Sequence, residues 1–115
     1  MTPKPMTHKE IEEYVLSMPN SWLDYPFGKD VAVYKVGPKD QGKMFALISE
    51  TKDPIQLSVK CDPELALVLR DTYDEVMPGY HLNKKHWNTI VMAGQTPWEE
   101  VQGFIRHSYE LVAKS

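Results

Sequence analysis

Three short runs near the middle of the chain have the apolar patterns of β-strands. Val31–Val36 is β-branched and apolar, Lys43–Ser49 is apolar on both faces, and residues 55–60 alternate cleanly between apolar and polar positions. Alternation with period two and β-branched residues are typical of strands. The connecting segments, 37–42 and 51–54, have turn chemistry and are too short for a helical crossover. We therefore predict an antiparallel β-meander, with the middle run as a central strand covered on both faces.

Helix signals precede this meander. Thr7 and Glu10 have the spacing of a capping box, and apolar residues recur at i, i+3, i+4 and i+7 from Ile11. Pro19 ends the pattern, so a helix is predicted between Thr7 and that proline. The aromatic-rich segment 21–28 contains a proline, which is typical of an edge strand or a lead-in to a sheet.

Two further helices are predicted in the second half of the chain. Asp62 caps the first of them, with Pro63 at its first position, and it ends near Tyr73. Residues 96–99 repeat the capping-box spacing and begin the last helix, and residues 89–92 form a short strand between the two. This order of elements predicts a two-layer α+β fold, in which helices pack on one face of a mainly antiparallel sheet made of the β-meander and the later strand.

Length and composition are those of one ordinary globular domain. A chain of 115 residues with 42% hydrophobic content can build one core, so residues 7–115 are predicted to form a single domain behind a flexible tail of residues 1–6. The lone cysteine, Cys61, excludes an internal disulfide framework and fits a reducing compartment. No run approaches the ~20 apolar residues that a membrane span needs. We expect a cytoplasmic monomer without a membrane segment.

The most unusual stretch of the sequence runs from Gly79 to Thr89. It contains two histidines, two lysines, two asparagines and two aromatic residues, with little of the apolar periodicity of a core segment. It also lies within the longest carboxylate-free segment, residues 76–98. We therefore predict that any ligand is contacted by side chains of this stretch.

Motif spacing argues against metal binding and catalysis. His81 and His86 are five residues apart, which would place them on opposite faces of a strand, and the chain has no Cys-x-x-Cys or His-x-x-x-His element. Cys61 precedes a helix N-terminus, which can lower a thiol pKa, but it also ends an apolar strand, where cysteine is usually buried. The carboxylates cluster on the predicted helices as solvated faces and first-turn charges. We expect no metal, no cofactor and no enzymatic activity.

Charge gives two opposing indications about nucleic acid. The net charge of −3 disfavours an overall attraction to DNA, whereas the lysines of the strands, turns and unusual stretch could form a local basic face. Tyr80, Asn83 and Trp87 would add stacking and hydrogen-bonding groups to such a face. Alternatively, these lysines are ordinary exposed residues that protect edge strands from aggregation. They are Lys35, Lys39, Lys43, Lys52, Lys60, Lys84 and Lys85.

Four short motifs between residues 26 and 109 occur together in this chain, within a likeness that runs from about residue 7 to residue 113. They are Pro26-Phe27-Gly28, Lys43-Met44-Phe45-Ala46, His81-Leu82-Asn83-Lys84 followed by His86-Trp87, and Ser108-Tyr109. This set resembles the MmcQ/YjbR family of small bacterial proteins, with the Leu-Asn-Lys-x-His-Trp run as its most specific part. The resemblance implies a YjbR-like or CyaY-like α+β fold and DNA binding through paired β-hairpin wings, here the turns at 37–42 and 51–54.

We therefore predict a non-enzymatic binding module, with alternatives for what it binds. The first is weak, salt-dependent binding of double-stranded DNA. The second is a small anionic metabolite, in a pocket walled by Trp22, Tyr25 and Trp87, or a protein partner at the same loop. A third interpretation makes Trp87 a structural plug in the core. The candidate binding residues are Lys39, Lys43, Lys52, His81, Asn83, Lys84, Lys85, His86 and Trp87.

Overall fold

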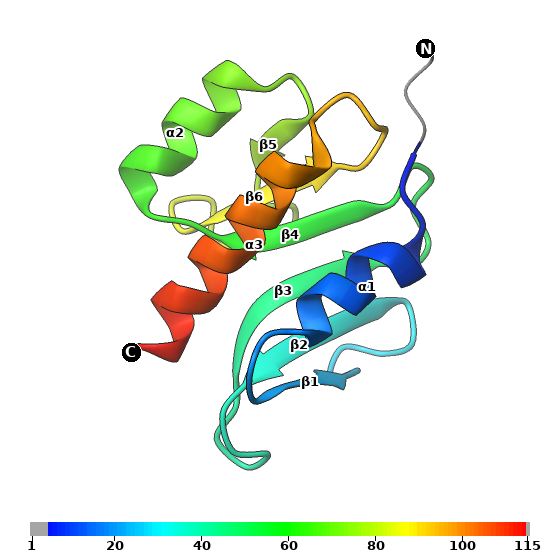
Figure 1. Ribbon diagram of the computed structural model, residues 1–115, viewed down its shortest axis with the longest axis vertical. Helices are drawn as coiled ribbons and strands as arrows, with labels where there is room; N and C mark the ends of the chain where they lie inside the picture. The colour runs from blue at the N-terminus through cyan, green and yellow to red at the C-terminus, as the bar shows by residue number, and fades with distance from the viewer. Residues whose placement is uncertain (1–4, 115) are drawn as a thin grey trace.

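The polypeptide forms one open antiparallel sheet with helices against it, so the predicted α+β class is confirmed (Figure 1). The computed structural model describes residues 5–114; residues 1–4 of the predicted tail and residue 115 lie outside the described part. Within that part, the strand order across the sheet is β1-β2-β3-β4-β6-β5, and every neighbouring pair is antiparallel. The elements are α1 (His8–Leu16), β1 (Ser21–Asp24), β2 (Val31–Val36), β3 (Lys43–Ser49), β4 (Gln56–Lys60), α2 (Pro63–Thr72), β5 (Val76–Pro78), β6 (Trp87–Val91) and α3 (Trp98–Ala113).

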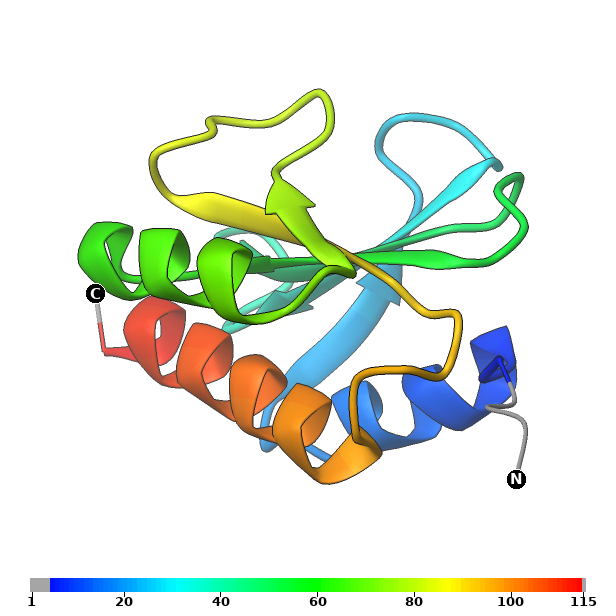
Figure 2. The same ribbon diagram turned by 90° about the horizontal axis from the view of Figure 1, so that it is seen from above.

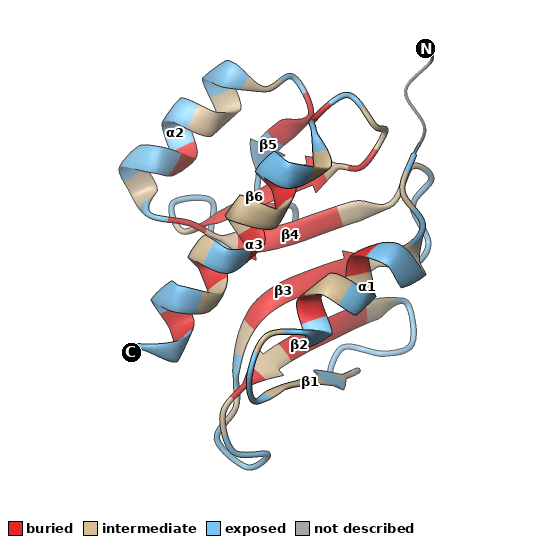
Figure 3. Cartoon of the chain, in the orientation of Figure 1, coloured by how far each residue is buried: buried red, intermediate tan, exposed pale blue. Residues whose placement is uncertain are grey.

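The main core lies between the helices and one face of the sheet. Strands contribute fully buried side chains such as Tyr34, Phe45 and Leu57, and the helices contribute Ile11 and Ile105. Figure 3 shows these buried positions on the strands and on the sheet-facing sides of the helices. Each large apolar side chain buried in this way contributes about 1.5–3 kcal/mol, so this layer is the principal source of stability.

A smaller apolar cluster lies on the opposite face of the sheet. Val33 and Leu47 are direct cross-strand partners on β2 and β3, and Trp87 packs with them. Figure 2 shows that this second face carries loops rather than helices. β3 is therefore apolar on both faces because both faces are covered, as its sequence predicts. We call this second face the open face.

Helices α1 and α2 begin at residues whose side chains cap them. Thr7 accepts a hydrogen bond from the Glu10 amide, and the Glu10 carboxylate accepts one from the Thr7 amide, so the predicted capping box of α1 is confirmed. Asp62 caps α2 and Pro63 is its first residue, as predicted. None of the described helices is both long enough and apolar enough to cross a bilayer.

The predicted capping box of the last helix is wrong. Thr96 does not cap α3, whose N-cap residue is Pro97 and which has no capping side chain. Instead, the Thr96 amide and hydroxyl both donate to the buried carboxylate of Glu75, at 2.8 and 2.6 Å. A buried carboxylate needs such donors, and this tertiary requirement overrides the local motif. Glu75 immediately precedes β5, a three-residue edge strand that the sequence pattern did not predict.

Ser108 of α3 links this helix to two strands. Its hydroxyl is fully buried, donates to the Phe45 carbonyl of β3 at 2.5 Å and accepts from the Lys60 amide of β4 at 2.8 Å. The neighbouring Tyr109 donates its hydroxyl hydrogen to the Pro19 carbonyl at 2.6 Å and packs edge-on against Phe45. The Ser108-Tyr109 motif therefore fixes the position of α3 on the sheet.

We expect Ser108→Ala to lower the free energy of unfolding by about 1–3 kcal/mol, because it leaves a buried carbonyl and a buried amide without their partner. Urea denaturation followed by circular dichroism would measure this loss. Glu110→Ala, at an exposed position on the same helix, is the matched control and should change stability by less than about 0.5 kcal/mol. Equal stability of the two variants would contradict the bridging role.

Candidate functional site

A hollow of about 470 Å³ opens on the open face of the sheet. Its floor consists of side chains from β2, β3 and β4 that point to the same face because they lie two residues apart on each strand. Its sides are the β1–β2 connection, the β3–β4 turn and the β5–β6 loop, and Figure 2 shows two of these segments rising from the sheet. We call it the open-face hollow; its lining residues are Phe27, Val31, Leu47, Ser49, Thr51, Lys52, Gln56, Ser58, Tyr80, His81 and Leu82.

Exposed aromatic rings, one lysine and one histidine characterise this hollow. Phe27 is 64% exposed and Tyr80 is 49% exposed, on segments far apart in the sequence. The Lys52 amino group lies 5.1 Å from the centre of the Tyr80 ring, and the His81 ring lies 4.0 Å from the same ring, centre to centre. The hydroxyl and amide groups of the floor can orient a ligand, and the rings offer apolar contact area. Together they suit a flat molecule that carries a negative charge.

The β5–β6 loop, residues 79–86, is held in place by its own backbone. The Gly79 amide donates to the Trp87 carbonyl at 2.9 Å, and a side chain at position 79 would bring a Cβ within 2.8 Å of the Trp87 Cβ. The Tyr80 amide donates to the Thr89 hydroxyl oxygen at 3.0 Å. The Asn83 side chain accepts from the Lys85 amide at 2.9 Å, which is the Asx-turn arrangement. This side of the hollow is therefore ordered without a ligand.

Arg70 of α2 anchors the other end of the same loop. Its Nε donates to the Asn88 side-chain oxygen at 2.7 Å, and its guanidinium also donates to the carbonyls of Lys84 and Trp87. The sequence did not predict this role, because a cation in the last turn of a helix is already accounted for by its favourable interaction with the helix dipole. No local signal connects Arg70 to a loop that begins nine residues later.

Trp87 and its neighbours serve mainly to build this loop. Trp87 is 8% exposed and packs under the loop against Val33 and Leu47, which supports the structural interpretation of this residue. His86 is half-buried, and its ring makes no hydrogen bond to the described residues. The Lys84 amino group donates to the Gly79 carbonyl at 3.2 Å. Of the predicted residues in the loop, His81 is the one that lines the open-face hollow.

The predicted basic residues do not gather at one place. Lys39 and Lys43 lie at the β2–β3 turn, whereas Lys52 lies at the β3–β4 turn. Successive turns of an antiparallel meander lie at opposite ends of the strand they share, so these two turns are separated by the length of β3, roughly 20 Å. Lys84 and Lys85 line a separate, smaller hollow beside α2. The two turns therefore cannot act as adjacent wings.

The aromatic walls predicted for a ligand pocket are also different from the observed ones. The Trp22 indole donates to the Gly37 carbonyl at 2.9 Å, and its ring lies beneath the amino groups of Lys35 and Lys39. The Tyr25 hydroxyl donates to the Glu50 carboxylate at 3.0 Å. A concave site does exist beside the loop, as that hypothesis required, but Phe27 and Tyr80 form its aromatic sides.

Within residues 5–114, no group of three or more His, Cys, Asp and Glu side chains is arranged to hold a metal ion. The histidines are dispersed: His8 is the first residue of α1 and contacts Glu12 and Glu50, and His107 lies on α3. Cys61 is buried, and its burial, together with the adjacent Asp62, raises the pKa of the thiol to about 11. This thiol is uncharged at neutral pH, which makes it a weak nucleophile.

Comparisons with known proteins agree on one family. The YjbR family model matches residues 16–111. The chain is 32% identical over 109 residues to the uncharacterised protein YbdF from Escherichia coli O157:H7, covering 95% of this chain and 86% of that protein. It is 30% identical over 105 residues to the uncharacterised protein YjbR from Escherichia coli strain K12, covering 91% and 86%.

Solved structures show the same fold. The crystal structure of protein DR2400 from Deinococcus radiodurans, described as a DUF419 domain, superposes with a TM-score of 0.91 and 39% identity, over 99% of this chain and 83% of that one. A crystal structure from Pseudomonas syringae gives a TM-score of 0.77 at 26% identity, over 93% and 99% of the two chains.

We expect Trp87→Ala to lower the free energy of unfolding by about 3–5 kcal/mol, because it empties the apolar cluster of the open face. Tyr80→Ala, an aromatic deletion at a half-exposed position of the same loop, should lower it by less than about 1 kcal/mol. Chemical denaturation of both variants would measure the difference. A Trp87→Ala protein as stable as the Tyr80→Ala protein would show that the indole does not support the fold.

Proposed function

The chain belongs to the YjbR family, and we propose that it is a non-enzymatic binding module whose open-face hollow binds a small anionic ligand with a flat apolar part. The observation that carries this proposal is the lining of the hollow. Among the described residues that form it, none is a carboxylate, although the protein has a net charge of −3. Lys52 and His81 supply positive or hydrogen-donating groups, beside the exposed rings of Phe27 and Tyr80.

Size and order of the site support the same proposal. Its volume of about 470 Å³ lies within the range of ~300–1,000 Å³ that is typical of small-molecule sites. The floor is rigid because it is made of paired strands, and the Ser58 hydroxyl is hydrogen-bonded to the Thr89 hydroxyl at 2.8 Å. Since Thr89 also holds the Tyr80 amide, this serine is committed to positioning the loop. That commitment favours binding over nucleophilic catalysis.

A titration with 1-naphthyl phosphate, followed by amide NMR shifts, tests this function. We expect saturable shifts in residues 27–31, 47–58 and 80–82. Tyr80→Ala should weaken binding by about fivefold or more, because aromatic stacking contributes ~1–3 kcal/mol. Lys52→Ala should also weaken it, whereas Lys39→Ala removes the same charge at the far end of β3 and should have no effect. Shifts located elsewhere, or equal effects of the two lysine variants, would contradict the proposal.

DNA is a second candidate ligand, favoured by the distribution of charge. Within residues 5–114, eight of the 16 carboxylates of the sequence lie on the helices, but only three of its 13 Lys and Arg residues do. Outside the helices, residues 5–114 carry nine Lys and eight Asp or Glu residues, a net charge of +1, whereas the helices carry a net charge of −5. Because Lys39 and Lys52 lie at opposite ends of β3, a duplex would have to lie along the sheet instead of engaging two neighbouring wings.

Titration with a short mixed-sequence duplex, at about 50 and 200 mM salt, tests DNA binding. If DNA binds in this way, amide shifts appear at both the 37–42 and 51–54 turns and fade at the higher salt. The slope of log affinity against log salt should fall by about one in Lys39→Ala and in Lys52→Ala. No shifts at the lower salt would exclude this ligand and would leave the 1-naphthyl phosphate result unaffected.

A further inference from the structure

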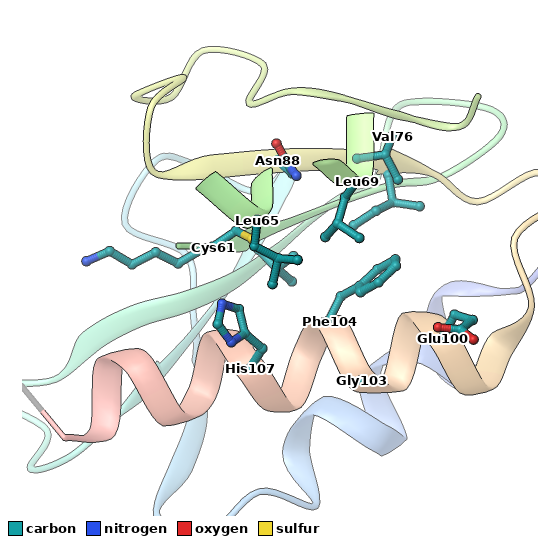
Figure 4. A pocket seen from close by; sticks show the side chains of 12 residues that line it. Cys61, Leu65, Leu69, Val76, Asn88, Glu100, Gly103, Phe104 and His107 are labelled. Carbon is teal, nitrogen blue, oxygen red and sulfur yellow. The ribbon is translucent and has the colours of Figure 1, made fainter. Parts of the chain in front are cut away.

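A second hollow, distinct from the open-face hollow, lies on the helix side of the sheet (Figure 4). It has a volume of about 240 Å³ and lies between α2, α3 and the underlying strands. Figure 4 shows Leu65 and Leu69 directed from α2 toward Phe104 and His107 of α3. Val59, Val76 and Ile90 complete its apolar surface. We call this space the α2–α3 cleft.

The cleft is partly open to solvent, since Leu65 of its lining is 37% exposed. Its apolar walls offer water few hydrogen-bonding partners. Its volume of about 240 Å³ exceeds the ~150 Å³ of an engineered apolar cavity that binds benzene. An apolar molecule of about that size or slightly larger would restore the packing that the side chains leave incomplete.

The state of α2 indicates that its apolar surface is incompletely covered. Within α2, all of whose residues are described, only Ala66 is buried. Leu65 is 37% exposed at the cleft, and Leu69 is half-buried. Val68, which is three residues after Leu65 on the same helix, is 57% exposed. A molecule in the cleft would cover Leu65, Leu69 and Phe104 together.

The polar groups of the cleft indicate which molecule would fit. The Nε2 of His107 accepts a hydrogen bond from the Asp62 amide at 3.2 Å, so the neutral ring carries its hydrogen on Nδ1. That Nδ1–H makes no hydrogen bond to the described residues and can donate to an oxygen atom. The charged residues of the lining, Lys60 and Glu100, have opposite signs, and the raised pKa of Cys61 keeps its thiol neutral. A neutral ligand matches this balance.

We propose that the α2–α3 cleft is a binding site for a small neutral molecule with an aromatic or short aliphatic body and one oxygen acceptor. The body packs between Leu65, Leu69 and Phe104, and the oxygen accepts the hydrogen bond from His107 Nδ1. This site differs from the open-face hollow in position, in polarity and in the charge of its ligand, and it does not depend on the function proposed for that hollow.

The test uses the full chain and three probes of similar shape: methyl benzoate, ethylbenzene and benzoate. We expect saturable amide NMR shifts in residues 59–69 and 100–107 with methyl benzoate. Ethylbenzene should bind about fivefold more weakly, because it lacks the acceptor for one hydrogen bond. Benzoate should bind more weakly than methyl benzoate, because its charge is not compensated. No saturable shifts with any probe up to its solubility limit would overturn the proposal.

Matched variants locate the site. Leu65→Trp fills the cleft and should weaken methyl benzoate at least tenfold, whereas Leu67→Trp adds the same side chain at a position that is 63% exposed and outside the lining, and should have no effect. His107→Phe should remove the preference for methyl benzoate over ethylbenzene. Thermal unfolding of each variant verifies that it is folded. Equal binding by the two tryptophan variants, or an unchanged preference in His107→Phe, would overturn the assignment.

Discussion

The second face of the sheet must be covered without helices, and most of the features of this structure depend on that constraint. The described helices lie against one face, so the apolar residues Val33 and Leu47 on the other face need a different cover. Trp87 provides it, together with Leu82 from the loop and Met44 from β3. A single indole can cover apolar side chains of two neighbouring strands, because its ring is broad, apolar and rigid. The part of the open face that Trp87 does not cover forms the floor of the open-face hollow.

This arrangement explains why the unusual stretch at 79–89 has its composition. Trp87 and Leu82 are packing residues, Asn83 forms the turn, and Gly79 is required by the close approach of the Trp87 backbone and Cβ. Histidine and lysine residues at such a loop resemble a binding motif in sequence, yet the Lys84 side chain bonds within the loop and, of these residues, His81 is the one that lines the hollow. The stretch contributes Tyr80 and His81 to the hollow, and the rest of the chemistry available to a ligand comes from residues outside it, such as Phe27, Lys52 and the polar floor of β3 and β4.

One side chain links the walls of the open-face hollow and the α2–α3 cleft. α2 lies at one side of the helix layer, where it contacts the short edge strand β5 and β6. Arg70 joins the last turn of α2 to Asn88 of β6 and to the Lys84 carbonyl of the β5–β6 loop. The same residue therefore supports one side of the open-face hollow from the helix that lines the α2–α3 cleft. The two sides of the sheet are linked through this contact, while their chemistry remains different.

The α+β class, the β-meander, the cap of α1 and the start of α2 could all be predicted from the sequence. These features depend on contacts between residues close in the chain, where periodicity and capping chemistry are visible. β5 and the use of Thr96 could not be predicted, because a three-residue edge strand has almost no periodicity and because Thr96 bonds to Glu75, 21 residues away.

The candidate site shows the same division. The sequence by itself indicated that Lys52 and His81 were candidates, but it also grouped them with Lys39, Lys84 and Trp87. In the tertiary structure these residues lie apart, because successive turns of a meander lie at opposite ends of the sheet. Trp87 is buried and is therefore a core residue. The sequence alone determined which residues form each helix or strand. Which of these residues share a surface depends on the pairing of strands that are distant in the chain.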